Sequence, residues 1–432
     1  MRVKLNLIKG FLFFATVLFL YIAVNTRWGG DEKWKAIIQG DGRGYYAYLP
    51  AVFIYHDLNY SFYDSVETQK IKWPAYNYRL HHKGRVINKY FSGTAVMEMP
   101  FFLMAHGISY LADKPMDGYS KLYFKFIHLS GIFYFILGLW FMSRFLAALG
   151  FRQFNIFITL IVITFGTNLF YYGLFESSLS HIYSFTIINM LVFYAHKFFK
   201  YQNHRLIIPL FIIVGLMLLV RPINVLALLS LPFIAGKWEV FKSGLAALWV
   251  NKFRTITGAL ITISFVAVQL VIYKISSGDW VIDSYNDSRG FQFLNAHFFD
   301  FLISYKKGLF LYTPVYLIAL TGMYFVFKES RYQFFTFFTF LIIVIYVFSS
   351  WTNWWYGGSF SSRVMVEYLP FFALSLTIAL QKIPMKSIRT GFIILIMALV
   401  VLCQIQTRQY LSTRIHWDSM TKEKYWDVFM KI

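Results

Sequence analysis

Cysteine is nearly absent from this 432-residue chain, and charged residues are scarce. The single cysteine, Cys403, lies in an apolar run, which excludes a disulfide or a cysteine metal site within one chain. Charged residues make up only 14% of the sequence and hydrophobic residues 58%, more apolar surface than a soluble domain of this size can bury. The composition therefore indicates an integral membrane protein whose solvent is the bilayer.

Acidic residues are also few, 20 against 41 basic ones, which gives a net charge of +21. In a soluble protein this balance favours nucleic-acid binding. Here the basic residues stand at the ends of apolar runs, where they set orientation and contact anionic lipid, so we expect no nucleic-acid partner. Aromatic residues reach 21%, and lipid-facing phenylalanines and interfacial tyrosines and tryptophans explain most of them.

The apolar runs predict an all-α membrane domain over residues 1–407 with about eleven transmembrane helices. A basic stub precedes the first run, and no small-residue cleavage site stands before Thr26, which favours an uncleaved first helix over a signal peptide. The predicted spans are 11–24, 122–143, 153–172, 181–199, 205–220, 222–236, 255–275, 309–327, 333–350, 364–381 and 389–407.

One further apolar run, 95–112, is ambiguous because it contains Glu98, Pro100 and His106. If it does not cross and the N-terminus is cytoplasmic, lysine and arginine gather in the inner segments, as the positive-inside rule requires. If it crossed, every later loop would change sides and the bias would reverse. We therefore expect a multi-pass protein of the inner (plasma) membrane in which 95–112 is interfacial. Its extracytoplasmic parts are a large first outer loop with interfacial helices (26–120), a second outer loop (276–308) and a short tail (408–432).

This topology places the polar clusters of the sequence on the outer side. The clusters are 39–50, 88–100, 165–181, 220–224, 278–290 and 351–363. A transporter would be expected to carry polar residues at mid-bilayer, on broken helices related by an internal repeat, and no repeat is visible. Polar clusters gathered on the outer side of the membrane favour an enzyme that works at the outer leaflet.

Asp41 is the most informative residue of these clusters. It stands among Gly40, Gly42 and Gly44, which allow a sharp turn and a close approach of the backbone to a ligand. Tyrosines follow it, among them Tyr45, in what is typical of a short amphipathic helix. A carboxylate held at the membrane surface can accept the proton of an acceptor hydroxyl. The alternative interpretation is that Asp41 caps the interfacial helix.

Three local patterns resemble the GT-C glycosyltransferases, a superfamily of multispanning enzymes that includes the protein O-mannosyltransferases and the aminoarabinose transferase of lipid A. They are GDGRGYYAYLP around Asp41, KYFSGTAVMEMPFF at 89–102 with DGYS at 117–120, and WWYGGSFSSR…YLP at 354–370. LLVRPINVLALL at 218–229 is similar to an Arg-Pro-x-Asn turn of such proteins. Two departures are that Phe91 replaces the usual proline and that Gly42 replaces a second acidic residue.

The resemblance implies an enzyme that passes a sugar from a polyprenyl-phosphate carrier to a glycan, lipid or protein acceptor with inversion, with Asp41 as general base. The phosphate of the carrier needs cations, preferably a bidentate guanidinium. Arg363 is the first candidate, Arg221 the second, and Lys89 follows with Lys306 and Lys307. The alternative for each cation is that it extends to lipid headgroups.

Other polar and aromatic residues of the clusters are candidates for binding substrate. We expect Tyr45, Tyr46, Glu98, Glu176, His181, Trp354 and Trp355 to serve this role. Helix capping by the serines between Glu176 and His181, and an aromatic belt for the tryptophans, are the alternative explanations.

We expect no metal or other cofactor, and a bound divalent ion is the alternative. His81 and His82 are adjacent and would point apart on any regular element, while Asp279, Asp283 and Asp287 lie between glycines that favour a loop. Two rival functions remain open: a transporter or flippase of lipid-linked saccharides, and a noncatalytic component of a surface-polysaccharide assembly complex.

Overall fold

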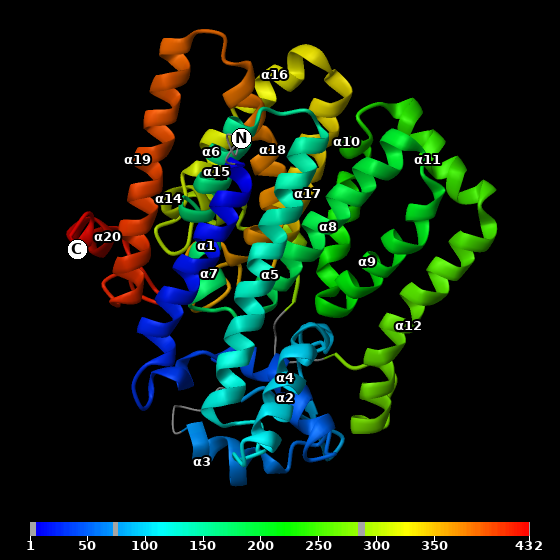
Figure 1. Ribbon diagram of the computed structural model, residues 1–432, viewed down its shortest axis with the longest axis vertical. Helices are drawn as coiled ribbons and strands as arrows, with labels where there is room; N and C mark the ends of the chain where they lie inside the picture. Colours follow the sequence, from blue (N-terminus) through cyan, green and yellow to red (C-terminus); the bar gives the residue numbers. More distant parts are fainter. Residues whose placement is uncertain (1–5, 72–76, 284–289, 432) are drawn as a thin grey trace, which may run out of the picture.

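The computed structural model describes residues 6–71, 77–283 and 290–431, which fold into a mostly helical membrane protein (Figure 1). Within these ranges seven helical segments are long and apolar enough to cross a membrane. They are α1 (Leu7–Ala23) with its π-helical extension η1 (Val24–Trp28), α5 (Lys121–Ala148), α8 (Ser180–Tyr201), α12 (Lys252–Ser277), α17 (Arg331–Ser349), the 3-10 helix η7 (Arg363–Tyr368) with α18 (Leu369–Lys382), and α19 (Lys386–Leu411).

The remaining predicted spans coincide with shorter or interrupted helices. The run 153–172 ends its first helix before Gly166, and the run 309–327 is broken at Pro314, which has no N–H to donate and clashes with the preceding turn. These pieces are α6 (Gln153–Phe165), α7 (Leu169–Leu174), η4 (His204–Leu206), α9 (Ile207–Val220), η5 (Pro222–Ser230), α10 (Leu231–Ala235), α14 (Leu309–Tyr312), α15 (Val315–Ala319) and α16 (Gly322–Glu329). The helix α11 (Trp238–Val250) connects α10 to α12.

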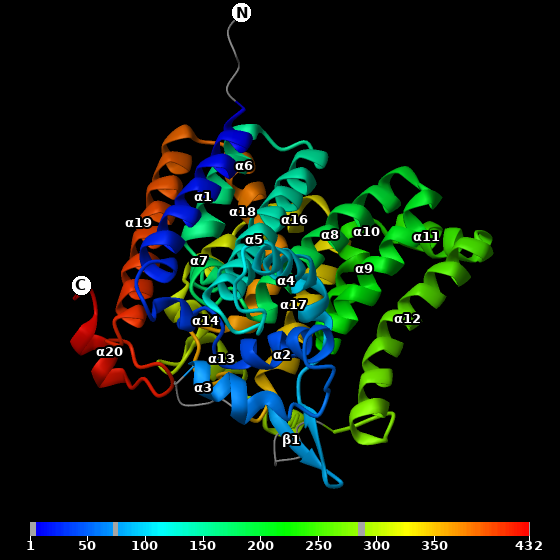
Figure 2. The same ribbon diagram turned by 60° about the horizontal axis from the view of Figure 1, so that its bottom comes forward.

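Residues of the predicted first outer loop gather at one end of the helical bundle, and α1 begins at the other end (Figure 1 and Figure 2). The elements of this loop are η2 (Lys33–Ala36), α2 (Asp41–Phe53), η3 (Tyr63–Glu67), α3 (Thr68–Ile71), β1 (Arg79–His82), β2 (Arg85–Asn88) and α4 (Gly93–Leu111). The antiparallel hairpin β1–β2 departs from the predicted all-α class. Its turn is Lys83-Gly84, with φ of 49° and 78°, as the tight two-residue hairpin turns require.

Burial divides the long helices into a central and a peripheral set. Most of α8 and of the η7–α18 segment is buried in the protein, whereas α12 and α19 leave most of their apolar surface uncovered. In Figure 1, α12 and α19 stand at opposite edges of the bundle. Because their uncovered residues are apolar, lipid is the solvent that suits them.

The helix α4 occupies the ambiguous run 95–112. It is not among the segments long and apolar enough to span within the described residues, and it packs on α2 and α5. At its start Gly93 touches the end of α9 so closely that a Cβ would lie 2.2 Å from the backbone nitrogen of Val220. The helix therefore belongs to the same packed unit as α2.

The topology predicts that α4 begins and ends on one side of the membrane. Lys83 precedes α4 in the sequence, Lys114 follows it, and both side chains are exposed. Cysteines at these two positions should react with a membrane-impermeant maleimide from the same side. The native Cys403 is fully buried and should not interfere. A cysteine at the exposed Lys386 is the control and should react only after permeabilisation. Labelling of positions 83 and 114 from opposite sides would show that α4 crosses.

Candidate functional site

Asp41 is the first residue of α2, and glycines explain how the chain reaches this position. Gly40 precedes it with φ +49° and is the N-cap residue of α2. The alternative interpretation of the sequence gave this capping role to Asp41. At Gly42 a Cβ would lie 2.2 Å from Oγ of Ser178, and at Gly44 it would lie 2.1 Å from the Tyr90 ring. The close neighbours of Gly42 and Gly44 in the structure are protein side chains, and the approach of a ligand to this backbone stays a prediction.

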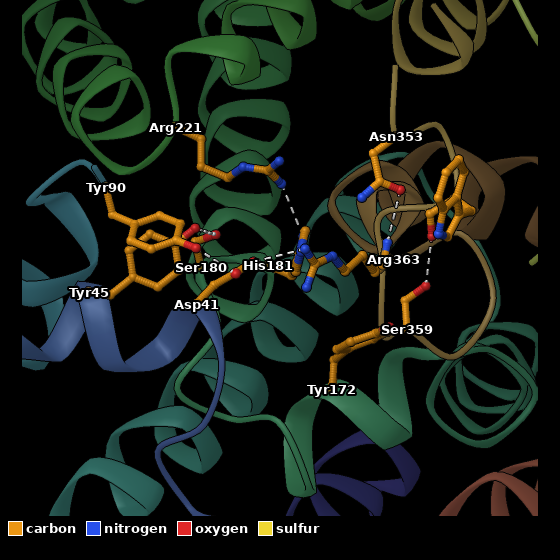
Figure 3. Close-up of polar contacts among 12 residues, drawn as sticks. Asp41, Tyr45, Tyr90, Tyr172, Ser180, His181, Arg221, Asn353, Ser359 and Arg363 are labelled. Atoms are coloured by element: carbon orange, nitrogen blue, oxygen red, sulfur yellow. Dashed lines mark hydrogen bonds and ion pairs between the residues drawn. The ribbon is translucent and has the colours of Figure 1, made fainter. Parts of the chain in front are cut away.

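The carboxylate of Asp41 joins two distant segments of the chain (Figure 3). Its Oδ1 accepts a hydrogen bond of 2.6 Å from the Tyr90 hydroxyl, and its Oδ2 accepts one of 2.8 Å from Nη2 of Arg363. The side chains are 20% exposed for Asp41 and 16% for Arg363. Arg363 is thus paired inside the protein and does not extend to headgroups.

A second charged cluster, formed by Glu367, Arg221 and His181, lies next to the first. Glu367 is fully buried, and its Oε1 accepts a hydrogen bond from Nη1 of Arg221. Nδ1 of His181 lies 2.9 Å from that oxygen and 3.0 Å from Arg221 Nη1. Arg221 reaches the cluster because the chain is extended there, between the end of α9 and Pro222. The buried carboxylate is therefore matched by a guanidinium.

The 3-10 helix η7 connects the two clusters. It carries Arg363 and Glu367, four residues apart. With about three residues per turn, these side chains leave the helix in different directions. Arg363 reaches α2 in the first outer loop, whereas Glu367 reaches α8 and the α9–η5 junction.

The segment that leads into η7 is held by the broken helices. The Asn168 side-chain amide donates to the carbonyls of Phe360 and Ser362, at 3.4 and 3.3 Å, and the Tyr172 hydroxyl accepts from the Phe360 N–H at 2.9 Å. Thr313, at the break before Pro314, shares a hydrogen bond of 3.1 Å with Ser361. The interruptions in these helices thus supply polar groups that fix the backbone before Arg363.

Three other predicted residues lie beside these clusters. Tyr45 accepts a hydrogen bond of 3.1 Å from Ser180, and its ring lies 4.8 Å from the Tyr90 ring. Glu176 accepts a hydrogen bond of 3.2 Å from Tyr171, and burial raises its pKa. Lys89 precedes Tyr90 and lies half-buried, with Nζ 5.4 Å from the Tyr90 ring centre.

Two predicted residues lie in interior packing away from Asp41. The Tyr46 hydroxyl donates to the carbonyl of Gly118, and its ring packs against Phe102, Tyr119 and Phe124. Glu98 is fully buried in α4, where its Oε1 accepts a hydrogen bond of 3.0 Å from Tyr183. The structure thus gives both residues partners within the packing of α4 and its neighbours.

The two tryptophans hold the second outer loop and the C-terminal tail together. The Trp354 ring stacks on His297 with centres 5.6 Å apart, and Nε1 of Trp355 donates to Asp418 at 2.9 Å. Lys306 lies over the Trp355 ring, 3.1 Å from its centre. Their neighbours are therefore protein groups, which a simple aromatic belt at the lipid interface does not explain.

Lys307 anchors the tail at the same place. Its ammonium is buried and donates to the carbonyls of His416 and Trp417, at 3.2 and 2.7 Å, and burial lowers its pKa to about 7. The predicted tail ends in a short helix, α20 (Lys422–Val428), whose Tyr425 is buried and accepts a hydrogen bond from Gln406 at 2.8 Å. The tail is thus packed onto the body of the protein.

Sequence reasoning missed Tyr90 and Glu367. Tyr90 stands in the quoted motif KYFSGT, where Lys89 drew attention instead. Glu367 is the one acidic residue in the apolar run 364–381, and an ionisable residue in such a run marks a functional site by default. Glu98, a candidate in the run 95–112, is another acidic residue of this kind, and the same rule would have identified Glu367.

The described residues contain no group of three or more histidine, cysteine or acidic side chains placed to hold a metal ion. Asp287 lies outside the described residues. Asp279 contacts His82 and Lys83 of the hairpin, both at 2.8 Å, and hydrogen bonds from these two side chains lower its pKa to about 2. Comparison of the chain with protein-family models and with curated proteins found no match.

Close packing at Gly42 generates a prediction about stability. Gly42→Ala should lower the free energy of unfolding by about 1–3 kcal/mol, because the new methyl group overlaps Ser178. The thermal midpoint of purified protein in detergent measures this change. Gly107→Ala, where nothing lies within 4 Å of the new Cβ, is the matched control and should leave the midpoint unchanged or slightly higher. Adding Ser178→Gly to Gly42→Ala should restore stability; no restoration would contradict the packing explanation.

Proposed function

We propose that this protein is a GT-C-like glycosyltransferase that moves a sugar from a polyprenyl-phosphate donor to an acceptor hydroxyl on the extracytoplasmic side of the inner membrane. The observation that supports it most is the contact between Asp41 and Arg363, which joins an acid and a cation suited to the two ends of such a reaction. The proposal includes eleven crossings, with the interrupted helices α6–α7, η5–α10 and α14–α16 and the short α9 each crossing once.

In the proposed reaction the acceptor oxygen attacks the anomeric carbon of the sugar as Asp41 takes the hydroxyl proton. The bond from the anomeric carbon to the phosphate oxygen breaks on the opposite face, so the configuration inverts. The electron pair leaves with polyprenyl phosphate. Arg363 offsets the growing negative charge of this leaving group, and Arg221, held by Glu367, is the second cation near it.

In the proposed reaction the Arg363 guanidinium has two alternative partners, the Asp41 carboxylate and the donor phosphate. Its Nη2 donates to Asp41, and its Nε is buried with no hydrogen-bond partner among the described residues. A phosphate group offers a bidentate partner to a guanidinium. We infer that donor binding draws Arg363 from Asp41 to the phosphate, so that Oδ2 of Asp41 can accept a hydrogen bond from the acceptor hydroxyl.

The interrupted helices are the observation that favours transport as a rival, because broken helices form the binding sites of many transporters. Here the polar groups at the breaks bind protein: Asn168 donates to Phe360 and Ser362, and Thr313 contacts Ser361. They therefore support the Arg363 segment. A panel of polyprenyl-phosphate sugars separates the two functions, because release of free polyprenyl phosphate indicates transfer, whereas movement of intact donor between leaflets indicates transport.

The role of Asp41 predicts a specific loss of activity. Asp41→Asn should reduce sugar transfer by about 10²–10⁴-fold, since the amide cannot accept the proton. Transfer is measured by release of polyprenyl phosphate from reconstituted protein. Asp31→Asn, an exposed acidic residue of the same outer loop, is the matched control and should transfer at the native rate. Transfer at the native rate by Asp41→Asn would remove Asp41 as the base.

If Arg363 exchanges Asp41 for the phosphate group, the Asp41→Asn variant should also bind polyprenyl phosphate, the leaving group, more tightly. Asp41→Asn should raise the affinity for polyprenyl phosphate by about tenfold, because Arg363 no longer has to break its ion pair. In an Arg363→Gln background the same change should have little effect. Binding of polyprenyl phosphate to the four proteins of this double-mutant cycle measures the coupling. Equal effects of Asp41→Asn in both backgrounds would show that Arg363 does not exchange partners.

A further inference from the structure

An apolar stretch of the second outer loop is held with its largest side chains facing out. Residues 291–303, which include η6 (Phe293–Asn295) and α13 (Phe298–Ile303), are called here segment 291–303. Five large apolar side chains of the segment are exposed: Phe291, Phe293, Leu294, Phe299 and Ile303, with Leu294 at 99%. No lysine, arginine, aspartate or glutamate occurs from Phe291 to Phe299. An apolar surface of this kind marks an interaction site.

The segment is fixed to the end of α17 by its backbone. The N–H of Gln292 donates to the carbonyl of Ser350 at 2.6 Å, and the N–H of His297 donates to the carbonyl of Ser349 at 2.9 Å. Phe301 is fully buried and anchors the other side of the segment. These contacts hold the backbone in place, so the outward direction of the apolar side chains is part of the fold.

The exposed surface of the segment continues the exposed apolar face of α17. On the candidate span α17, the exposed apolar residues Phe335, Ile342 and Tyr346 are seven and four positions apart, which places them on one helix face. The Tyr346 hydroxyl donates to the carbonyl of Phe293 at 2.7 Å, and the two rings are 5.9 Å apart. The Phe293 ring then stacks on Phe291, at 5.4 Å and 8°. The row of exposed rings thus runs from the α17 face into segment 291–303.

We propose that segment 291–303 lies in the outer leaflet of the bilayer, where its exposed side chains contact lipid acyl chains near the headgroups. The segment carries one acidic residue, Asp300, which lies 3.0 Å from His297 of the same segment. Its exposed aromatic and aliphatic side chains suit that boundary, because burial of each stabilises membrane contact in proportion to its apolar area. The partner is therefore membrane lipid. The segment contacts the end of α17 that the predicted topology places in the outer leaflet. The candidate site lies close by, since the hydroxyl of Ser362, the residue before Arg363, donates to the carbonyl of Phe301 at 3.3 Å.

Fluorescence quenching tests the location of the segment. Leu294→Cys, labelled with a polarity-sensitive fluorophore in proteoliposomes, should be quenched severalfold more by nitroxide-labelled lipid than by aqueous iodide. Lys83→Cys on the β1–β2 hairpin, where the native side chain is 69% exposed, is the matched control and should show the opposite preference. Cys403 is fully buried and should remain unlabelled.

Two results would overturn the proposal. One is iodide quenching at position 294 equal to that at position 83, which would place the segment in water. The other is protection from both quenchers in a protein that crosslinks through position 294, which would mean that a second copy of the chain covers the segment. Neither result depends on enzymatic activity, so this test is independent of the proposed function.

A kinetic test joins the segment to lipid-linked substrate, and this test rests on the proposed function. Leu294→Asp should raise KM severalfold for a long-chain polyprenyl-phosphate sugar, which reaches the site from the leaflet. It should leave KM unchanged for a short-chain donor that dissolves in water. Leu294→Met is the control and should keep both values native. If the short-chain donor is affected equally, the substitution acts on the fold; if neither donor reacts with the native protein, the proposed function fails and the quenching result still decides the location.

Discussion

The ion pair between Asp41 and Arg363 is the contact on which the organisation of the outer end depends. It joins residues 322 positions apart and connects the first outer loop to the start of a buried helix. Because both side chains are largely buried, removing either partner breaks the ion pair in a region with little water, at a cost of up to about 3–5 kcal/mol. The pair thus couples the position of α2 to that of η7, and through Glu367 to Arg221 and His181.

Backbone packing brings the two halves of this pair together. Gly42 and Gly44 allow α2 to contact Ser178 and Tyr90 without the space that a Cβ needs, and Gly93 allows α4 to contact the end of α9. Asn88 adds to this arrangement, since its amide donates to the Gly44 carbonyl at 2.7 Å and its oxygen accepts from the Tyr90 N–H at 3.0 Å. The outer loop is therefore packed on the bundle as part of one body.

Sequence patterns predicted the class and several site residues but not their contacts. The mostly helical membrane class is confirmed by the structure, whereas the number of crossings stays a prediction. Asp41 and Arg363 were each singled out by residue type and neighbours, and their pairing requires the fold. Glu98 and Glu367 are both lone acids in apolar runs; only the structure separates them, because a uniformly apolar run has no periodicity that tells which face meets the site. Hydropathy averaged over a window also concealed the break at Pro314, although the proline itself was a signal.

The hydrogen bonds from Lys307 to the carbonyls of the C-terminal tail have a consequence for biosynthesis. Chains emerge from the ribosome N-terminal end first, so the first outer loop is made long before the residues that complete its surroundings. Arg363 follows Asp41 only after most of the helices have been inserted, and the carbonyls of His416 and Trp417 that hold Lys307 come later still. Until then Arg363 cannot pair with Asp41, and the tail carbonyls that accept from Lys307 have not been made. Water or headgroups must solvate these charges in the nascent chain, so assembly of this region is one of the last events in making the protein.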